Sequence, residues 1–243
     1  MPFVTGLGWV TAGNMGCGRE RHSFHMTCGS LPSLTRKSVT DKPFPHFGRM
    51  DGFSKLGLAG IAFALKDAGL HEWTERRPIG IIASTVYGCL QTDVDYYGTV
   101  MQDNGLPPSP TLFSYTLPNC FLGETASHFG TTGLSYVIHD SDFASLSSLK
   151  ALLLNMRLHA FEKALAGIVD EPCPLDSPYL SRTEPGAAFV MVEKTPHSAQ
   201  SPYGHVTLKE SGEVLLNGKK QDTLIHLIQA CLADLRGGRS RDC

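Results

Sequence analysis

Apolar residues recur at helical spacing most clearly in four segments of the chain. Between Ser54 and Ala68 they fall three and four positions apart, which predicts an amphipathic helix, and Gly69 supplies a stop signal after it. The same spacing predicts three further helices, at residues 119–129, 145–158 and 224–235. In the helix at 145–158, the predicted buried side consists of Leu146, Leu149, Leu152, Leu153 and Met156.

Continuous apolar and β-branched runs lie between these segments and predict strands. The run Ile79-Gly-Ile-Ile-Ala-Ser-Thr-Val has the composition of a strand that is buried on both faces. Further strands are expected at residues 3–11, 134–139, 164–171, 187–192 and 205–210. Because strands alternate with helices, the fold class is predicted to be α/β, with a mixed, mostly parallel sheet covered by helices on both faces. Residues 17–48 show no periodicity and are expected to form a long surface excursion.

Composition narrows the functional classes. The chain has 243 residues, of which 42% are hydrophobic, so it can bury a substantial core. A net charge of -2 lacks the basic field that nucleic-acid binding requires. No apolar run approaches the ~20 residues of a membrane helix, and no signal segment is recognised, so we expect a cytoplasmic protein without membrane insertion.

Little in the sequence supports a cofactor or a metal. The seven cysteines form no CxxC pair and match no zinc pattern, and their odd number is typical of a reducing compartment. The glycines at positions 6 and 8 lack the third glycine and the later acidic residue of a dinucleotide site. We therefore expect neither a metal nor a nucleotide cofactor.

Residues 134–149 predict a strand, a sharp turn and the start of a buried helix. Acyl-transferring enzymes place a Ser or Cys at such an elbow, where the helix amides stabilise a thiolate or oxyanion. This elbow contains no cysteine. Ser141 and Ser145 lie within it, and Asp142 is expected to cap the following helix.

Several segments, in order along the chain, resemble the N-terminal half of a β-ketoacyl synthase of the thiolase-like superfamily. The resemblance runs from residue 1 to about residue 195 and implies a thiolase-like half-fold. We expect one such domain at residues 1–215, followed by a short C-terminal helix and tail at 216–243. The segments are Val4-Thr-Gly-Leu-Gly-Trp-Val-Thr, Met50-Asp-Gly-Phe-Ser-Lys-Leu-Gly-Leu-Ala, Ile79-Gly-Ile-Ile, Tyr115-Thr-Leu-Pro-Asn, Gly123-Glu-Thr-Ala-Ser-His-Phe-Gly, Ala164-Leu-Ala-Gly-Ile-Val-Asp-Glu and Glu184-Pro-Gly-Ala-Ala-Phe-Val-Met-Val-Glu.

The chain departs from active members of that family in two ways. Alignment on Gly133-Leu-Ser-Tyr-Val-Ile-His-Asp puts Phe143 where the family has its nucleophilic cysteine, and a phenyl ring cannot attack a thioester. The family's second half-fold, with two catalytic His residues or a His and an Asn, has no counterpart among the matched segments. The resemblance therefore implies a catalytically silent protein with no catalytic residue, similar to the chain-length-factor-type partners of type II polyketide and aryl-polyene synthases.

This resemblance also implies partners and binding residues. The expected partner is a full-length ketosynthase in a heterodimer, or a second copy of the chain in a homodimer, and an acyl carrier protein would be met only indirectly. The implied process is polyketide or fatty-acid-type biosynthesis. The stretch from Pro108 to Asn119 matches the segment that lines the acyl tunnel near the dimer axis. Candidates for the tunnel wall or the partner interface are thus Phe113, Tyr115, Thr116, Asn119 and Phe143.

Two other functions remain open at this point. The chain could be a stand-alone acyltransferase or thioesterase that uses Ser141, Ser145 or a cysteine such as Cys89 or Cys120. It could also be a structural homodimer without a role in acyl chemistry. For Phe143, the position could be the floor of an acyl channel or an ordinary core aromatic, and both interpretations predict that its ring is buried.

Overall fold

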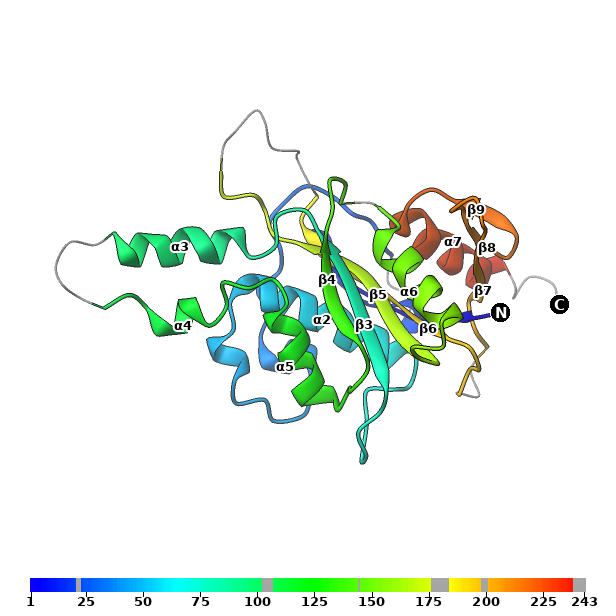
Figure 1. The fold of residues 1–243 in the computed structure, drawn as a ribbon, viewed down its shortest axis with the longest axis horizontal. Helices are drawn as coiled ribbons and strands as arrows, with labels where there is room; N and C mark the ends of the chain where they lie inside the picture. Colours follow the sequence, from blue (N-terminus) through cyan, green and yellow to red (C-terminus); the bar gives the residue numbers. More distant parts are fainter. Residues whose placement is uncertain (21–22, 102–106, 144, 176–183, 198–200, 238–243) are drawn as a thin grey trace.

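The computed structural model describes residues 1–20, 23–101, 107–143, 145–175, 184–197 and 201–237. These residues form a nine-stranded sheet with the order β4-β3-β5-β6-β1-β7-β8-β9, and β2 pairs with β1 (Figure 1). The strands are β1 (Phe3–Thr11), β2 (Met15–Cys17), β3 (Ile79–Thr85), β4 (Ser135–His139), β5 (Lys163–Asp170), β6 (Gly186–Glu193), β7 (Gly204–Leu208), β8 (Val214–Leu216) and β9 (Lys219–Gln221).

Strand directions confirm the predicted mixed, mostly parallel central sheet. Strands β4 and β5 both run parallel to β3. Strand β6 is antiparallel to both β5 and β1, so β1 runs in the same direction as β3, β4 and β5. The antiparallel strands β7, β8 and β9 extend the sheet beyond β1.

Helices cover both faces of this sheet, as predicted. On one face α2 and α5 pack in one apolar cluster with β1, β3 and β6, and on the other α6 and α7 pack in a second cluster with β5 and β7 (Figure 1). None of the helices in the described ranges has both the length and the apolar character needed to cross a membrane. The helices are α1 (Arg36–Val39), α2 (Gly52–Asp67), α3 (Leu90–Val100), α4 (Pro110–Phe113), α5 (Cys120–Phe129), α6 (Ser147–Arg157) and α7 (Leu224–Gly237), with two 3-10 turns at Gly18–Glu20 and Phe47–Arg49.

Local sequence explains why α2 lies so close to the sheet. Asp51 caps its first turn by accepting a hydrogen bond from the Ser54 amide at 3.0 Å, and Gly69 follows its end with a φ of 70°. A Cβ atom on Gly8 of β1 would lie 2.1 Å from the Ala64 amide nitrogen. Glycine at this position therefore permits the helix to contact the strand backbone directly.

A buried carboxylate at the end of α2 ties this helix to three distant parts of the chain. Asp67 accepts hydrogen bonds from the Leu7 amide at 2.8 Å, the Arg19 amide at 2.7 Å and the Tyr203 hydroxyl at 2.7 Å. The Arg19 guanidinium also stacks 4.7 Å from the centre of the Tyr203 ring. Burial raises the pKa of Asp67, and these hydrogen bonds lower it in part.

The prediction of a surface excursion at residues 17–48 is wrong in part. Phe24, Met26, Phe44 and Phe47 are all buried, and the Phe24 ring packs 5.3 Å from that of Trp9. Isolated anchors of this kind leave no periodic pattern, so hydrophobic spacing does not reveal them. The domain boundary expected at residue 215 stays a prediction, and β8 spans that position.

Candidate functional site

The carboxyl ends of β3, β4 and β5 meet at one edge of the sheet. Thr85 pairs with His139, and Ser84 pairs with Ile168, so all three strands end at the same level. The amide of Asp140 donates to the Thr85 carbonyl at 2.8 Å, which joins the loop after β3 to the turn after β4. Ligand sites of parallel α/β sheets lie at this end of the strands, so this carboxyl edge is the candidate site.

The structure confirms the strand before the predicted elbow and the helix after it, β4 and α6, but not the predicted cap. Leu146, and not Asp142, is the N-cap residue of α6. The Ser145 hydroxyl oxygen accepts from the Ser147 amide at 3.2 Å and the Ser145 hydroxyl donates to the Asp140 carboxylate. The predicted cap was wrong because the first turn of α6 is stabilised by another residue. The Ser145 hydroxyl accepts from the Ser147 amide and is itself bound to Asp140.

Asp140 carries negative charge at the start of α6. Burial raises its pKa, but hydrogen bonds from Ser145, Ser147 and the Ser141 amide outweigh that effect and hold the pKa below its ordinary value. The anion that the helix N-terminus favours is therefore already present in this chain, as a carboxylate.

Phe143 lies in the elbow with its ring only 7% exposed. It belongs to the same apolar cluster as Leu146 and Leu149 of α6 and Ile168 of β5. Both interpretations of Phe143, the channel floor and the core aromatic, predict this burial, so the burial does not choose between them. It does remove the ring from contact with bulk solvent.

A second carboxylate, which no sequence pattern had singled out, holds the loop after β3. Asp170, the last residue of β5, is buried and accepts from the Thr85 hydroxyl at 2.7 Å and from the Val86 and Tyr87 amides at 2.8 Å each. Burial raises the pKa of Asp170, and the amide and hydroxyl donors lower it in part. The available signal was an acidic residue at the end of an otherwise mostly apolar strand.

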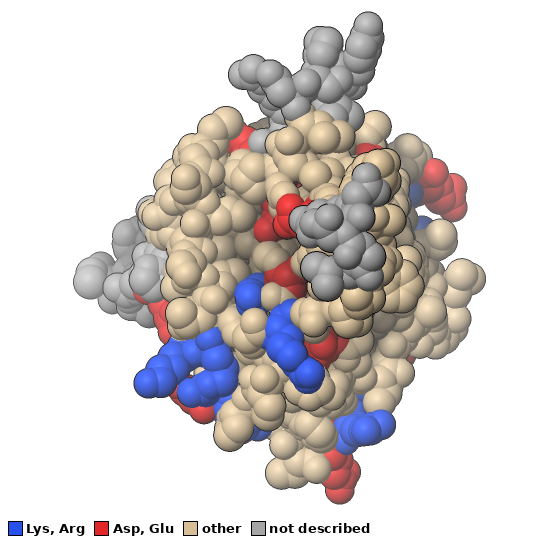
Figure 2. Space-filling model, turned by 90° about the vertical axis from the view of Figure 1, so that its left-hand side faces the viewer, with Lys and Arg blue, Asp and Glu red and all other residues tan. Residues whose placement is uncertain are grey.

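Glu171, the next residue, is a third carboxyl group at this edge and titrates near neutral pH. Burial, followed by the nearby Asp51 and Asp95 carboxylates, raises its pKa to about 7, although it accepts from the Phe53 amide at the start of α2. Asp51 also accepts from the Thr92 hydroxyl at 2.6 Å. Figure 2, which views this side of the molecule, shows acidic side chains near the centre of the face and Lys and Arg side chains below them.

The candidate tunnel residues fall into two groups. Phe113, Tyr115, Thr116 and Asn119 share the segment from α4 to the start of α5, where Thr116 donates to the Phe113 carbonyl at 2.9 Å and Tyr115 donates to Glu124 at 2.9 Å. Tyr115 is buried, whereas Phe113 and Asn119 are exposed. Tyr115 belongs to the cluster on the α2 face and Phe143 to the cluster on the α6 face, so the structure does not place all five in one pocket.

Helices α3 and α4 form an arm that projects from the body (Figure 1). They pack on each other, with the Tyr96 and Phe113 rings 5.5 Å apart. The arm exposes large apolar side chains, including Tyr97 at 61%, Met101 at 60% and Phe113 at 62%. Strand β4 is the edge strand on this side of the described sheet. Exposed apolar surface next to an unpaired edge is typical of an interaction site.

The alternative nucleophiles are poorly prepared for attack. Burial, followed by the nearby Asp93 carboxylate, raises the pKa of Cys89 to about 12, and burial also raises the pKa of Cys120. A thiol that stays protonated is a weak nucleophile. The hydroxyl of Ser145 binds Asp140, and the Ser141 amide donates to the same carboxylate at 2.8 Å. Among the described residues, neither Ser141 nor Ser145 has a hydrogen bond to a histidine that could act as its base.

Comparison with known proteins gives one family and a set of similar structures. Residues 33–182, more than half of the chain, match the family described as the N-terminal domain of β-ketoacyl synthase. No curated protein matches the chain.

Three solved structures illustrate the likeness of fold. "The ishigamide ketosynthase/chain length factor" has a TM-score of 0.63 and 15% identity over 84% of this chain and 65% of that one, so this chain spans about two thirds of its length. The acyl-carrier protein–ketosynthase complex AntDE:AntF of a type II PKS has a TM-score of 0.61 and 16% identity over 85% of this chain and 67% of that one. A ketosynthase in complex with its chain length factor from Xenorhabdus doucetiae has a TM-score of 0.55 and 16% identity over 81% and 80%.

Proposed function

Because the chain belongs to the β-ketoacyl synthase N-terminal domain family, we propose that it is a non-catalytic subunit that pairs with an active ketosynthase. In that pair it shapes the acyl pocket during polyketide or fatty-acid-type biosynthesis in the cytoplasm. The observation that carries the proposal is the buried ring of Phe143 at the elbow between β4 and α6, where the family resemblance puts the nucleophile.

The chemistry of the carboxyl edge supports a silent role. A phenyl ring cannot form the acyl-enzyme, and the carboxylate of Asp140 already occupies the helix start that would stabilise a thiolate. Cys89 and Cys120 stay protonated at neutral pH because burial raises the pKa of each. Acyl groups would therefore be carried by the partner and not by this chain.

The exposed surface supports pairing. The arm presents Tyr97, Met101 and Phe113 to solvent, and one side of β4 is paired with no other strand among the described residues. Two of the similar structures are described as a ketosynthase with a chain length factor, and a third as a ketosynthase with an acyl-carrier protein. We infer that the arm and β4 contact the ketosynthase and that an acyl carrier protein meets the assembled pair.

Co-expression with a full-length ketosynthase of the same organism tests the pairing. We expect a one-to-one complex on size-exclusion chromatography, which the double variant Tyr97→Asp with Met101→Asp weakens at least tenfold. Leu158→Asp is the matched control, because Leu158 is 71% exposed but follows the end of α6, away from the arm. A homodimer that never exchanges with a ketosynthase would support the structural homodimer instead, and equal effects of arm and control variants would refute the interface.

Intact-mass analysis with a chloroacyl or acyl-thioester probe tests whether this chain forms an acyl-enzyme. We expect the ketosynthase of the complex to gain one adduct and this chain to gain none. A stoichiometric adduct on Ser141, Ser145, Cys89 or Cys120 would instead favour the stand-alone acyltransferase or thioesterase. Peptide mapping identifies the modified residue.

A further inference from the structure

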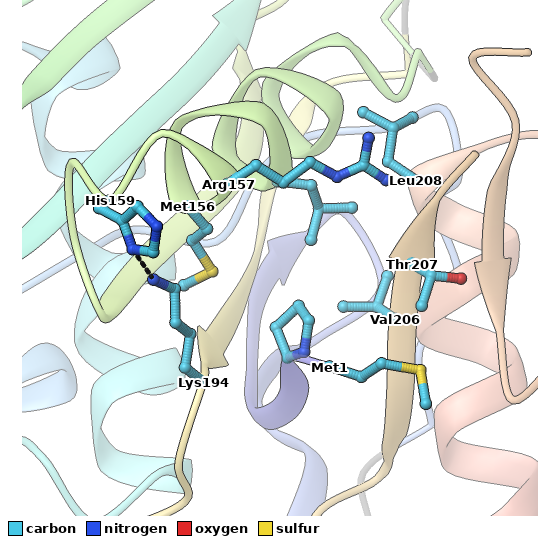
Figure 3. A pocket seen from close by; sticks show the side chains of 10 residues that line it. Met1, Met156, Arg157, His159, Lys194, Val206, Thr207 and Leu208 are labelled. Atoms are coloured by element: carbon cyan, nitrogen blue, oxygen red, sulfur yellow. Dashed lines mark hydrogen bonds between the residues drawn. The ribbon is translucent and has the colours of Figure 1, made fainter. Parts of the chain in front are cut away.

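A pocket lies at the opposite end of α6 from the elbow. Its volume is about 420 Å³, and its walls come from the last turns of α6, from β7 and from the first two residues of the chain (Figure 3). The elbow precedes Ser147 and the pocket begins near Leu153 and Arg157, so the two are separated by roughly 10–15 Å along the helix axis. The pocket is therefore distinct from the carboxyl edge, and a ligand bound there would be independent of the proposed function.

The interior of the pocket is apolar. Leu153 and Met156 line it from α6, and Val206 and Leu208 line it from β7. Figure 3 shows the Met156 sulfur facing the space between α6 and β7, with the Met1 side chain along the other side. A cavity of this size with apolar walls falls within the range that binds small organic ligands.

The rim of the pocket is cationic. Arg157 extends across the pocket toward Leu208 (Figure 3), and among the described residues its guanidinium has no hydrogen bond or ion pair. Lys194 lies across the pocket from it, where its ammonium contacts His159 at 3.4 Å and is paired with Glu162 at 2.8 Å. None of the ten lining residues is acidic. The charge that remains for a ligand is thus positive and centred on Arg157.

We propose that this pocket binds an amphiphile with one anionic head and a medium-length alkyl chain, such as a fatty acid. The alkyl chain lies in the pocket between α6 and β7, and the carboxylate pairs with the Arg157 guanidinium, whose planar fork matches a carboxylate. Apolar burial supplies most of the affinity, and the guanidinium selects the anion over a neutral chain of the same length.

The proposal is tested with decanoate and 1-decanol as probes, by isothermal titration on the purified full chain. We expect saturable one-to-one binding of decanoate. Arg157→Glu should weaken decanoate binding about tenfold or more and leave 1-decanol binding unchanged. Lys37→Glu is the charge control, since Lys37 is exposed on α1 and does not line the pocket. Equal binding of decanoate to wild type and Arg157→Glu would overturn the proposal.

A second pair of variants tests the site itself. Leu208→Trp fills the pocket from its partly exposed rim and should abolish binding of both probes, whereas Leu154→Trp, on the exposed side of α6, should not. A photoreactive fatty acid should label peptides that contain Met156, Val206 or Met1 in the wild-type chain, which keeps the test valid if Leu208→Trp folds poorly. Labelling at the Phe143 elbow, or equal effects of the two Trp variants, would refute the assignment.

Discussion

We predict that Glu171 makes the stability of the chain depend on pH near neutrality. Its pKa rises from the ordinary value of 4.5 to about 7, first through burial and then through Asp51 and Asp95. The folded state therefore holds a proton between these values that the unfolded state has released. Stability from this group is fully present below about pH 4.5 and is lost as the pH rises through about 7.

The size of the effect follows from the shift. A shift of the Glu171 pKa from 4.5 to about 7 corresponds to about 3 kcal/mol of unfolding free energy if all of it acts on folding. Glu171 is only partly buried, so solvent screens its carboxylate and we expect about 1–2 kcal/mol. The variant Glu171→Gln, which cannot ionise, should be more stable than wild type by that amount at pH 8 and equal to it at pH 4.

The assay is urea unfolding of both proteins at pH 4, 5, 6, 7 and 8, with the difference in free energy of unfolding plotted against pH. Taking the difference removes the titration of other groups. Asp95→Asn should lower the pKa of Glu171 and move the curve to lower pH, whereas Glu210→Gln, an exposed carboxyl on the turn before β8, should leave it unchanged. A difference between wild type and Glu171→Gln that does not vary with pH would refute the reasoning.

Two further predictions concern the buried carboxylates. Asp170→Asn puts an amide donor against the Val86 or Tyr87 amide and should lower the free energy of unfolding by about 1–3 kcal/mol. Urea unfolding measures this loss. An unchanged free energy of unfolding would show that the loop after β3 does not depend on the carboxylate. Tyr203→Phe removes one donor from Asp67 and should cost about 1–2 kcal/mol, whereas Tyr97→Phe on the exposed arm should cost nothing measurable in the same assay.

Regular periodicity predicted most of the fold. The helices α2, α5, α6 and α7 lie where the spacing of apolar residues placed them, because burial on one face leaves a repeating pattern. Strand β3 lies where a continuous apolar run placed it, because both of its faces are buried. The strands β2, β8 and β9 were missed, since three residues are too few to show a pattern. No pattern in the sequence pointed to Asp67 or Glu171 as partners of distant residues. Their contacts join positions far apart in the chain, and only the folded arrangement brings them together.

The proposed silence of the elbow has two separable causes, the missing thiol and the charge arrangement around Asp140, and Phe143→Cys separates them. A cysteine there would be buried among apolar side chains and would follow Asp140 by three residues in the chain. Burial and a neighbouring carboxylate both raise a thiol pKa. We therefore expect iodoacetamide to modify it no faster than Cys89 at pH 7, measured by peptide mass spectrometry, with exposed Cys28 as the reactive control.

Adding Asp140→Asn to Phe143→Cys should lower the thiol pKa and speed alkylation, because the start of α6 would then lack its resident anion. The smaller side chain also leaves a cavity, so about 2–4 kcal/mol of stability should be lost in both variants, and alkylation rates are compared only where each is folded. A fast-reacting thiol in Phe143→Cys alone would show that the elbow still activates a nucleophile. In that case the phenyl ring, and not the charge arrangement around Asp140, would account for an unreactive elbow.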